Sequence, residues 1–342
     1  MLLGNLACGT REQGKNIKRP DPNVKASITA VWDTTDWKNL RTYYRLADGR
    51  IVGEDSLYSF DATNDCESDG KIRFRDRVTD KVGFFDASGR IVVPAIYNDA
   101  SPFYNGMSIA IRNAKRVGWD GEDCEKGDCE HWYWSGGNSM IIDAENHVLV
   151  DTLKIDNNAL VNWYSLEIRD KPADTTLYYS LKGADDKWYV FVDYQKEFDK
   201  WFQEKYLAGS MNLRKLRESA YDSLVSSLPE HEAQSDEGRM SGDEFIQKCG
   251  RRLIARLQPI RAKKIRISTG PTMFGLNPYT YMGSSFAQYF DKCGESNLSR
   301  YPAFDVTSNF MDQNGRLDYQ EHYSFLRTDK GYKLIGVSWR NP

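Results

Sequence analysis

Cysteine is the residue type that offers the clearest chemistry in this chain of 342 residues. Two of the six cysteines, Cys124 and Cys129, lie in one polar loop that also contains Gly121 and Gly127. A short loop of this kind can close into a disulfide ring. The alternatives are a structural metal and free thiols, yet zinc needs a second ligand pair, which His131 alone does not supply. We predict a Cys124–Cys129 disulfide, and hence an oxidising compartment.

Two further cysteines, Cys249 and Cys293, lie in the C-terminal part of the chain. Neither has a neighbour in the sequence that would activate it as a nucleophile. We therefore predict that Cys249 and Cys293 pair in a second disulfide if the compartment is oxidising.

Catalytic arrangements are scarce in this sequence. No histidine belongs to a metal-binding pair or stands beside a serine elbow, and no Gly-rich loop that would cradle phosphate is present. The 49 acidic residues make some close pair of carboxylates inevitable, so no pair can be assigned glycosidase chemistry. We predict a protein that is not an enzyme and that carries no cofactor and no metal.

One acidic stretch, Asp312–Glu321, invites comparison with a calcium-binding loop. The first ligand position of such a loop would be Phe310, which has no oxygen to offer. Asn314-Gly315 between two alternating apolar runs is instead a strong hairpin signal. We therefore predict a β-hairpin here rather than a calcium site.

Composition restricts the class of protein further. The apolar fraction of 40% and the charged fraction of 28% are typical of a soluble globular chain, and the 13% of aromatic residues favours β structure. A net charge of -3 argues against a general nucleic-acid binder. No apolar run approaches the length that spans a bilayer. We expect no nucleic-acid partner and no contact with a membrane, except through a lipid anchor.

The stretch Val82–Ala110 is the clearest structural unit in the sequence. Two runs of β-branched and aromatic residues flank Asp86–Gly89, which predicts a tight hairpin. Pro94 should end the second strand, because proline cannot donate to a β ladder. Asn105-Gly106 predicts another turn, followed by a third strand.

This stretch resembles the WG repeat, a β-rich repeat with Gly-aromatic-hydrophobic-Asp-x-x-Gly-Lys/Arg followed by Pro, an aromatic residue and Phe-x-x-Gly-x-Ala. The residues that carry the resemblance are Gly83, Phe84, Asp86, Gly89, Arg90, Pro94, Tyr97, Phe103, Gly106 and Ala110. Phe84 stands where the repeat has its Trp, so an aromatic packing role is kept. The resemblance implies a non-catalytic unit that serves protein interaction.

Weaker copies of the same pattern flank this unit. Tyr44–Phe74 shares its Gly-Arg-Ile-Val turn and strand, and Met140–Val150 repeats the hairpin with Asn146 in place of the turn glycine. Asn tolerates the left-handed backbone region better than other side chains. Trp188–Asp193 is either a degenerate fourth copy or a capping strand. Self-similarity at this period predicts a stacked array.

An aromatic-rich insertion, Lys115–Asn138, separates two of these copies. Such an insertion usually forms a loop on one face of an array, and Trp and Tyr dominate interface energetics. The candidate partner-binding residues are Trp119, His131, Trp132, Tyr133 and Trp134. The alternative is that these rings fold back onto the sheet as local core.

The C-terminal part has a different pattern. Apolar residues at helical spacing predict helices over 198–207, 213–228 and 243–257, the last capped by Ser241. Strands are predicted over 265–268, 304–311, 316–326 and 332–339. This order loosely resembles NTF2-like domains of the bacterial envelope, which implies a pocket. The aromatic and methionine residues that would line or plug it are Met273, Phe274, Tyr279, Tyr281, Met282, Phe286, Tyr289 and Phe290.

The predicted fold class is β-rich plus α+β. Residues 1–27 form an N-terminal tail and linker, residues 28–194 an antiparallel β-repeat array of WG type, and residues 195–342 an NTF2-like domain with helices on a curved antiparallel sheet. Such an organisation indicates a binding function rather than catalysis.

The N-terminus bears on localisation. Leu6-Ala7-Cys8 resembles the end of a bacterial lipobox, which implies lipidation of Cys8 in the natural precursor. The alternative is an N-terminal tail with an incidental cysteine. Together with the predicted disulfides, the resemblance implies a periplasmic or envelope protein.

The function predicted from these features is recognition of another protein. Its most concrete form is an immunity protein that neutralises a secreted antibacterial effector by occlusion. The alternatives are a small-ligand-binding or enzymatic NTF2-like protein and an envelope scaffold that binds cell-wall glycan through stacked aromatics. Sequence alone does not separate them, because aromatic side chains serve all three.

Overall fold

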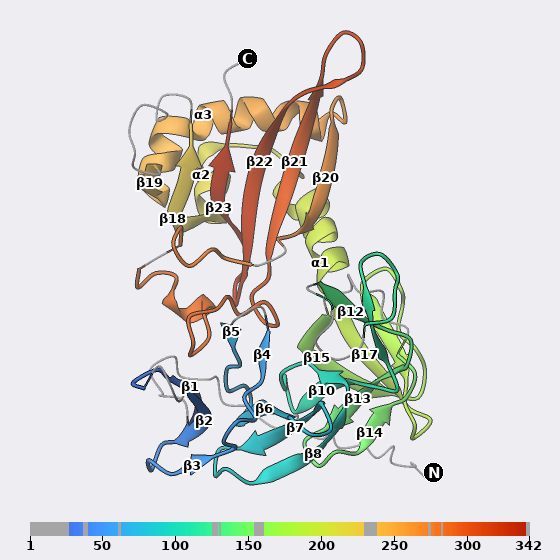
Figure 1. Cartoon of the computed structure of the whole chain (residues 1–342). Coiled ribbons are helices and arrows are strands. Elements are labelled where there is room, and N and C mark those ends of the chain that lie inside the picture. Colours follow the sequence, from blue (N-terminus) through green and yellow to red (C-terminus); the bar gives the residue numbers. More distant parts are fainter. Residues whose placement is uncertain are drawn as a thin grey trace, which may run out of the picture.

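The computed structural model describes residues 27–36, 40–60, 63–124, 129, 131–153, 161–228, 238–272, 275–281 and 283–339. Strands account for 47% of the structure and nearly all pair in antiparallel fashion, which confirms the predicted β-rich class. Small sheets make up the N-terminal half, and one larger sheet with its helices makes up the C-terminal half (Figure 1). Within the described residues, no helix combines the length and apolar character needed to cross a membrane.

Three N-terminal sheets share one strand order, in which a strand pairs with the first strand of the hairpin that follows it. The first contains β1 (Ile28–Asp33), β2 (Arg41–Leu46) and β3 (Ile51–Val52), and the second contains β6 (Lys71–Asp76), β7 (Lys81–Asp86) and β8 (Ile91–Tyr97). The third contains β10 (Met107–Arg112), β13 (Asn138–Asp143) and β14 (Val148–Val150), with β9 (Asp99–Ala100) added at one edge. The predicted hairpins at Tyr44, Phe84 and Met140 therefore occupy equivalent places in their sheets.

The last N-terminal sheet departs from this order. It consists of β15 (Val161–Arg169), β17 (Trp188–Asp193) and β16 (Tyr178–Lys182), with β17 in the centre. Here the second strand of the hairpin, rather than the first, pairs with the preceding strand. A further small pair, β4 (Ser59–Phe60) and β5 (Thr63–Asn64), lies between the first two sheets in the chain.

The hairpin turn at Asp86–Gly89 forms as predicted. The Oδ1 atom of Asp86 accepts hydrogen bonds from the backbone N–H groups of Ser88 and Arg90 at 2.9 and 3.0 Å, and Gly89 has a φ of 82°. Burial raises the pKa of the Asp86 carboxyl, but hydrogen bonds from the Ser88 hydroxyl, from these backbone N–H groups and from the Arg90 guanidinium outweigh it and hold that pKa well below its ordinary value. The turn beginning at Asp143 repeats this geometry with Asn146 at a φ of 67°, which confirms the predicted substitution for glycine.

A second kind of turn precedes the closing strands. Tyr104 and Met107 exchange two backbone hydrogen bonds across Asn105-Gly106, which confirms the predicted turn. Ser68 and Lys71 do the same across Asp69-Gly70, which the sequence analysis did not single out. In both turns the two central residues have positive φ angles, as tight hairpins of this type require.

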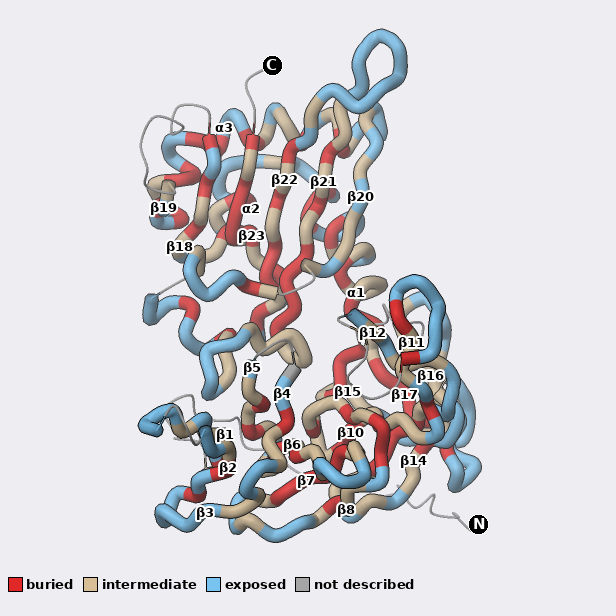
Figure 2. The backbone as a smooth tube through the Cα atoms, in the orientation of Figure 1, coloured by how far each residue is buried: buried red, intermediate tan, exposed pale blue. Residues whose placement is uncertain are grey.

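The central sheets bury both of their faces. On β7, Phe84 belongs to a core that includes Tyr97, Phe103 and Ile142, whereas its neighbour Phe85 belongs to a second core with Tyr44 and Phe74. Successive side chains of a strand point to opposite faces, so one strand can serve two cores. Figure 2 shows buried stretches in red along the strands of the N-terminal half, β7 and β10 among them.

The structure corrects one prediction within this unit. Strand β8 does not end at Pro94 but continues through it to Tyr97. The strand lies at the edge of its sheet and its register with β7 is irregular, so the missing N–H of Pro94 is tolerated. Pro94 is exposed.

The C-terminal half is built on one six-stranded sheet. Its strand order is β19 (Gly238–Ser241), β18 (Ala220–Ser227), β23 (Gly331–Ser338), β22 (Leu317–Thr328), β21 (Ala303–Met311) and β20 (Arg266–Pro271). The helices are α1 (Tyr194–Trp201), the π-helical turn η1 (Phe202–Tyr206), α2 (Leu213–Ser219), α3 (Gly242–Arg261) and the 3-10 turn η3 (Ala287–Tyr289). The four strands predicted near the C-terminus are present.

Two helix boundaries differ from the predictions. The helix predicted over 213–228 ends at Ser219, and the chain continues as strand β18. The apolar spacing of these residues suits a helix. Strand β18 nevertheless forms, because its backbone pairs with both β23 and β19. Helix α3 is capped by Ser241 as predicted but extends through Pro259 to Arg261.

The six-stranded sheet is covered on both faces. Phe325 contacts the helical side, where Phe198 of α1 stacks against Phe304 at 4.5 Å between ring centroids. Leu326, the next residue along β22, belongs to a separate core with Phe286 and Tyr289. Of the residues predicted to line or plug a pocket, Phe286 and Tyr289 are therefore core residues, while Met273, Phe274 and Met282 lie outside the described residues.

The hairpin predicted at Asn314-Gly315 also forms, joining β21 to β22. The Oδ1 atom of Asp312 accepts hydrogen bonds from the N–H groups of Asn314 and Arg316, both at 2.8 Å. The carboxylate that a calcium loop would use is thus engaged by its own turn.

The disulfides agree with one prediction and correct the other. Cys124 pairs with Cys129, as predicted. Cys293 pairs with Cys66 and not with Cys249, which is buried in the helical core of the C-terminal half. The predicted Cys249–Cys293 disulfide was therefore wrong, because the loop that carries Cys293 faces the N-terminal half.

The Cys66–Cys293 disulfide joins the two halves of the chain beside further contacts. The ammonium group of Lys292 lies 3.4 Å from a carboxylate oxygen of Glu67, whose side chain is almost fully buried. The guanidinium of Arg300 lies 5.0 Å from the centre of the Tyr164 ring. The segment Asp291–Arg300 is thus fixed to the N-terminal half by a covalent bond, an ion pair and a cation–π contact.

Candidate functional site

The aromatic insertion forms a separate two-stranded hairpin. Strand β11 (Lys115–Gly118) pairs with β12 (Trp132–Ser135), so that Arg116 lies opposite Trp134 and Gly118 opposite Trp132. The Cys124–Cys129 disulfide closes the segment between the two strands. Because side chains alternate along a strand, the hairpin has an inner and an outer aromatic face.

The inner face consists of Arg116, Trp132 and Trp134. The guanidinium carbon of Arg116 lies 4.3 Å from the ring centre of Trp132 and 5.2 Å from that of Trp134. The two indole rings meet edge to face at 5.1 Å, and the indole N–H of Trp134 donates to Asp99 at 3.1 Å. The two inner tryptophans therefore follow the alternative prediction, that of local packing against the sheet.

The outer face consists of Trp119, His131 and Tyr133. The side chain of Trp119 is 79% exposed and that of Tyr133 is 50% exposed. The rings of Trp119 and His131 lie 5.4 Å apart, so they support one another without being covered. These three of the five predicted partner-binding residues are exposed, whereas Trp132 and Trp134 are half-buried.

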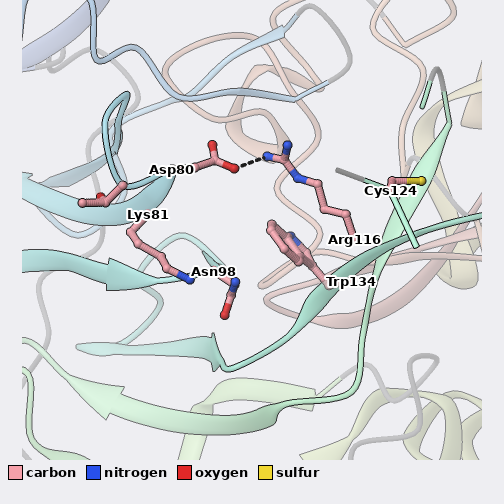
Figure 3. Close-up of a pocket in the computed structure, with 7 residues that line it drawn as sticks. Asp80, Lys81, Asn98, Arg116, Cys124 and Trp134 are labelled. Carbon is pink, nitrogen blue, oxygen red and sulfur yellow. Dashed lines mark ion pairs between the residues drawn. The ribbon is translucent and has the colours of Figure 1, made fainter. Parts of the chain in front are cut away.

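Beneath the hairpin lies a cavity of about 170 Å³ that the sequence analysis missed. Figure 3 shows Lys81, Asn98, Arg116 and Trp134 around it, with Asp80 directed toward Arg116. The carboxylate of Asp80 and the guanidinium of Arg116 form an ion pair at 2.7 Å. No sequence signal joined these residues, because Asp80 ends the turn between β6 and β7 and Lys81 begins β7, far from Arg116 in the chain.

Positive charges outnumber negative charges around this cavity. Arg75 forms ion pairs with Asp80 at 3.5 Å and with Asp99 at 3.9 Å. Because Asp80 also pairs with Arg116, two carboxylates neutralise two guanidinium groups. Lys81 adds a third cation, and within the described residues it forms no ion pair. Burial lowers the pKa of the Arg116 guanidinium, an effect that Asp80 opposes and Arg75 reinforces. The site therefore carries a local excess of positive charge.

Cys8 and the metal-type side chains are the remaining groups that could ligate or be modified. Cys8 lies outside the described residues. Two groups of metal-type side chains come together in the part of the chain that the structure describes: Cys66, Asp291 and Cys293, and Asp143, Glu145 and His147. The first group is used by the disulfide, and the second is a turn whose Asp143 carboxylate is engaged by backbone N–H groups.

A larger cavity lies beside strand β20 in the C-terminal half. It measures about 490 Å³ and is bordered by Thr272, Leu276, Tyr279, Glu295 and Asp305. Tyr279, one of the predicted pocket residues, is 80% exposed at its rim. The side chain of Asp305 accepts a hydrogen bond from Ser324 at 2.6 Å.

Comparison with known family models gives one local match. Residues 83–115 match the family model described as WG containing repeat. This segment runs from β7 through β8, β9 and β10 to the start of β11, so the match ends where the aromatic hairpin begins. No match was found among curated proteins, and none among solved structures. The resemblance of the C-terminal half to NTF2-like domains receives no support from these comparisons.

Proposed function

We propose that this chain is a non-catalytic recognition protein that binds another protein through the outer face of the β11–β12 hairpin. The observation that carries the proposal is the exposure of Trp119 and Tyr133 on a hairpin whose inner face is fixed by Arg116 and two tryptophans. Aromatic side chains on a rigid support lose little conformational entropy on binding. The matched WG repeat, a non-catalytic unit, supplies that support.

The most concrete form of this proposal is an immunity protein of the bacterial envelope. Occlusion of an effector's active surface requires only a rigid complementary face, which is what the hairpin offers. The exposed carboxylates of Asp120, Glu122 and Asp123 beside it would steer a basic partner. Envelope localisation is supported by the two disulfides, which persist in oxidising compartments. We further propose that the flanking units, Tyr44–Phe74 and Met140–Val150, are WG-type repeats that stack on residues 83–115.

The substitution Trp119→Ala tests the proposed binding face. We expect partner affinity to fall at least roughly 30-fold, because exposed Trp anchors at interfaces contribute 2 kcal/mol or more. The measurement is capture of envelope proteins on immobilised protein, followed by calorimetric titration of the captured partner. Thermal stability should not change, since Trp119 is largely exposed.

Trp32→Ala is the matched control, because Trp32 is also an exposed tryptophan, at 52%, but lies on β1. Equal loss of affinity in both variants would contradict a specific role for the hairpin. Capture of glycan rather than protein by the wild-type chain would favour the scaffold function instead.

A second candidate function is small-ligand binding in the C-terminal cavity. Its volume falls in the range of ligand pockets, and it combines the Tyr279 ring with the carboxylates of Glu295 and Asp305. Among the described residues neither carboxylate forms an ion pair, so a cationic small molecule suits the site best.

This candidate predicts that a cation co-purifies with the protein and is lost on substitution of Asp305. Mass spectrometry of the denatured wild-type protein should detect it, and Asp305→Asn should retain at least tenfold less, while keeping an acceptor for Ser324. Asp318→Asn, on the exposed β22 hairpin, is the control and should retain as much as wild type. Absence of any bound cation in wild-type protein would count against this function.

A further inference from the structure

We propose that the cavity beneath the β11–β12 hairpin receives a single carboxylate group, supplied by an acidic side chain of the protein partner. This inference rests on the proposed recognition function and names the chemistry of one contact within it. Three observations carry it: the charge of the cavity walls, the state of their hydrogen-bonding groups, and the size and position of the cavity on the inner side of the hairpin that bears the outer aromatic face.

The charge of the walls favours an anion. The charged residues that line the cavity are Lys81, Arg116 and Asp80, which give one excess positive charge. Behind them, Arg75 and Asp99 add one charge of each sign, so the excess is unchanged. Asp80 is shared by both arginines, and one oxygen of Asp99 is already occupied by the indole N–H of Trp134. A carboxylate entering the cavity would therefore balance the remaining charge of Lys81.

The hydrogen-bonding groups show which atoms are still available. Both polar atoms of the Asn98 side chain are already engaged, because it exchanges two hydrogen bonds with the backbone of Ala114, both at 3.0 Å. By contrast, the buried Nε of Arg116 has no hydrogen-bond partner in the described part of the chain. Buried donors in native structures are almost always paired, so an acceptor is expected here. The Nε–H of Arg116 and the ammonium of Lys81 are the donors we assign to the carboxylate.

The size and position of the cavity select the source of the carboxylate. A volume of about 170 Å³ suits the end of an aspartate or glutamate side chain better than a drug-sized ligand, which needs at least about 300 Å³. Trp134 lines the cavity while its strand neighbour Tyr133 is on the outer face. Because the cavity and the outer face lie on opposite sides of one two-stranded hairpin, a partner seated on the outer face would reach the cavity by extending around the edge of the hairpin.

One feature opposes an anion, namely the exposed carboxylates of Asp120, Glu122 and Asp123. These groups are solvent-exposed, so their fields are screened over a Debye length of about 8 Å at physiological salt. Asp123 is also paired with Lys115 at 3.2 Å. The walls of the cavity are screened less, because Arg116 and Asp80 are mostly buried. The partner we infer is basic at its rim and carries one acidic anchor.

Titration with acetate tests the cavity without any partner. The indole N–H of Trp134 is followed by NMR in ¹⁵N-labelled full-length protein while sodium acetate replaces sodium chloride at constant ionic strength. We expect a saturable shift with a Kd on the order of 1–10 mM. Lys81→Met should weaken binding at least tenfold, whereas Lys115→Met, which removes the same charge from the outer face, should leave the Kd within twofold.

A linear, non-saturating shift, or equal binding by Lys81→Met and wild type, would overturn the site. A capped glutamate residue, N-acetyl-glutamyl-N-methylamide, identifies the source of the carboxylate: binding as tight as acetate supports a partner side chain, and binding of acetate alone overturns that assignment. Trp119→Ala should bind acetate normally. If it does so and also keeps its partner, the proposed function fails while the carboxylate site stands.

Discussion

Replacing both Cys66 and Cys293 by serine is expected to lower the free energy of unfolding by about 5 kcal/mol, which is the largest effect we predict for a covalent change. The disulfide closes a loop of 227 residues, and the entropy that a cross-link removes from the unfolded chain grows with loop length. At about 2 °C per kcal/mol for a chain of this size, the melting temperature should fall by roughly 10 °C.

The double variant Cys124→Ser/Cys129→Ser is the matched control. Its disulfide closes a loop of only 5 residues, so the same reasoning predicts a loss of about 2 kcal/mol. Both variants are compared by differential scanning calorimetry and by urea unfolding without reductant. Substituting both cysteines of each pair avoids a new disulfide with Cys249. A larger loss in the Cys124/Cys129 variant than in the Cys66/Cys293 variant would show that loop closure does not govern stability here.

Calorimetry also tests how the halves are coupled. Lys292 pairs with Glu67 and Arg300 packs on Tyr164 beside the disulfide, so in the wild type we expect the two halves to unfold together. Without the disulfide, the ion pair and the cation–π contact remain, but the segments that carry them are no longer tethered side by side, so the coupling between the two halves becomes weaker. The double serine variant should therefore show two separated transitions rather than one.

The disulfide also illustrates what sequence could not supply. Six cysteines allow 15 connectivities, and the choice depends on which loops meet in space. The sequence placed Cys249 and Cys293 in one domain and paired them on that basis. In the structure, Cys249 faces the helical core, while Cys293 sits in a turn on the segment that returns to the N-terminal half. The sequence around Cys249 and Cys293 contains no signal that the segment carrying Cys293 packs against the N-terminal half.

Local signals, by contrast, were sufficient for the turns. Asp86–Gly89, Asn105-Gly106 and Asn314-Gly315 all formed as predicted, because each turn is determined by side chains that bond their own backbone and by residues that accept positive φ. Strand β18 was missed since its residues fit a helical period, and only pairing with β23 decides otherwise. Local chemistry decides turns, whereas distant partners decide ambiguous strands.

The candidate site was predicted in part. The alternation in Trp132-Tyr133-Trp134 already contains the division into two faces, since residues of a strand alternate. The sequence does not indicate which face packs against the protein. That depends on Arg116, which packs on Trp132, and on Asp99, which accepts the hydrogen bond from Trp134. The cavity residue Lys81 was not foreseen at all. Its role follows from the placement of one hairpin over another sheet.

The substitution Gly83→Ala is expected to destabilise the protein by about 3 kcal/mol, the second large effect. A Cβ atom at this position would lie 2.5 Å from the carbonyl oxygen of Val93 and 2.8 Å from the amide nitrogen of Ala95. Both atoms belong to the backbone of β8, which cannot move aside as a flexible side chain would. The φ of Gly83 is not in the left-handed region, so the cost is steric alone.

Gly270→Ala is the appropriate control for Gly83→Ala. Gly270 is also a strand glycine without a positive φ, but nothing lies within 4 Å of the Cβ position, so this variant should be neutral or slightly stabilising. Urea unfolding followed by circular dichroism measures both. A loss below about 1 kcal/mol for Gly83→Ala would mean that β8 shifts away from β7 at little cost. That outcome would remove the physical reason for glycine at the start of the WG pattern, since close approach of β7 and β8 is what the residue permits.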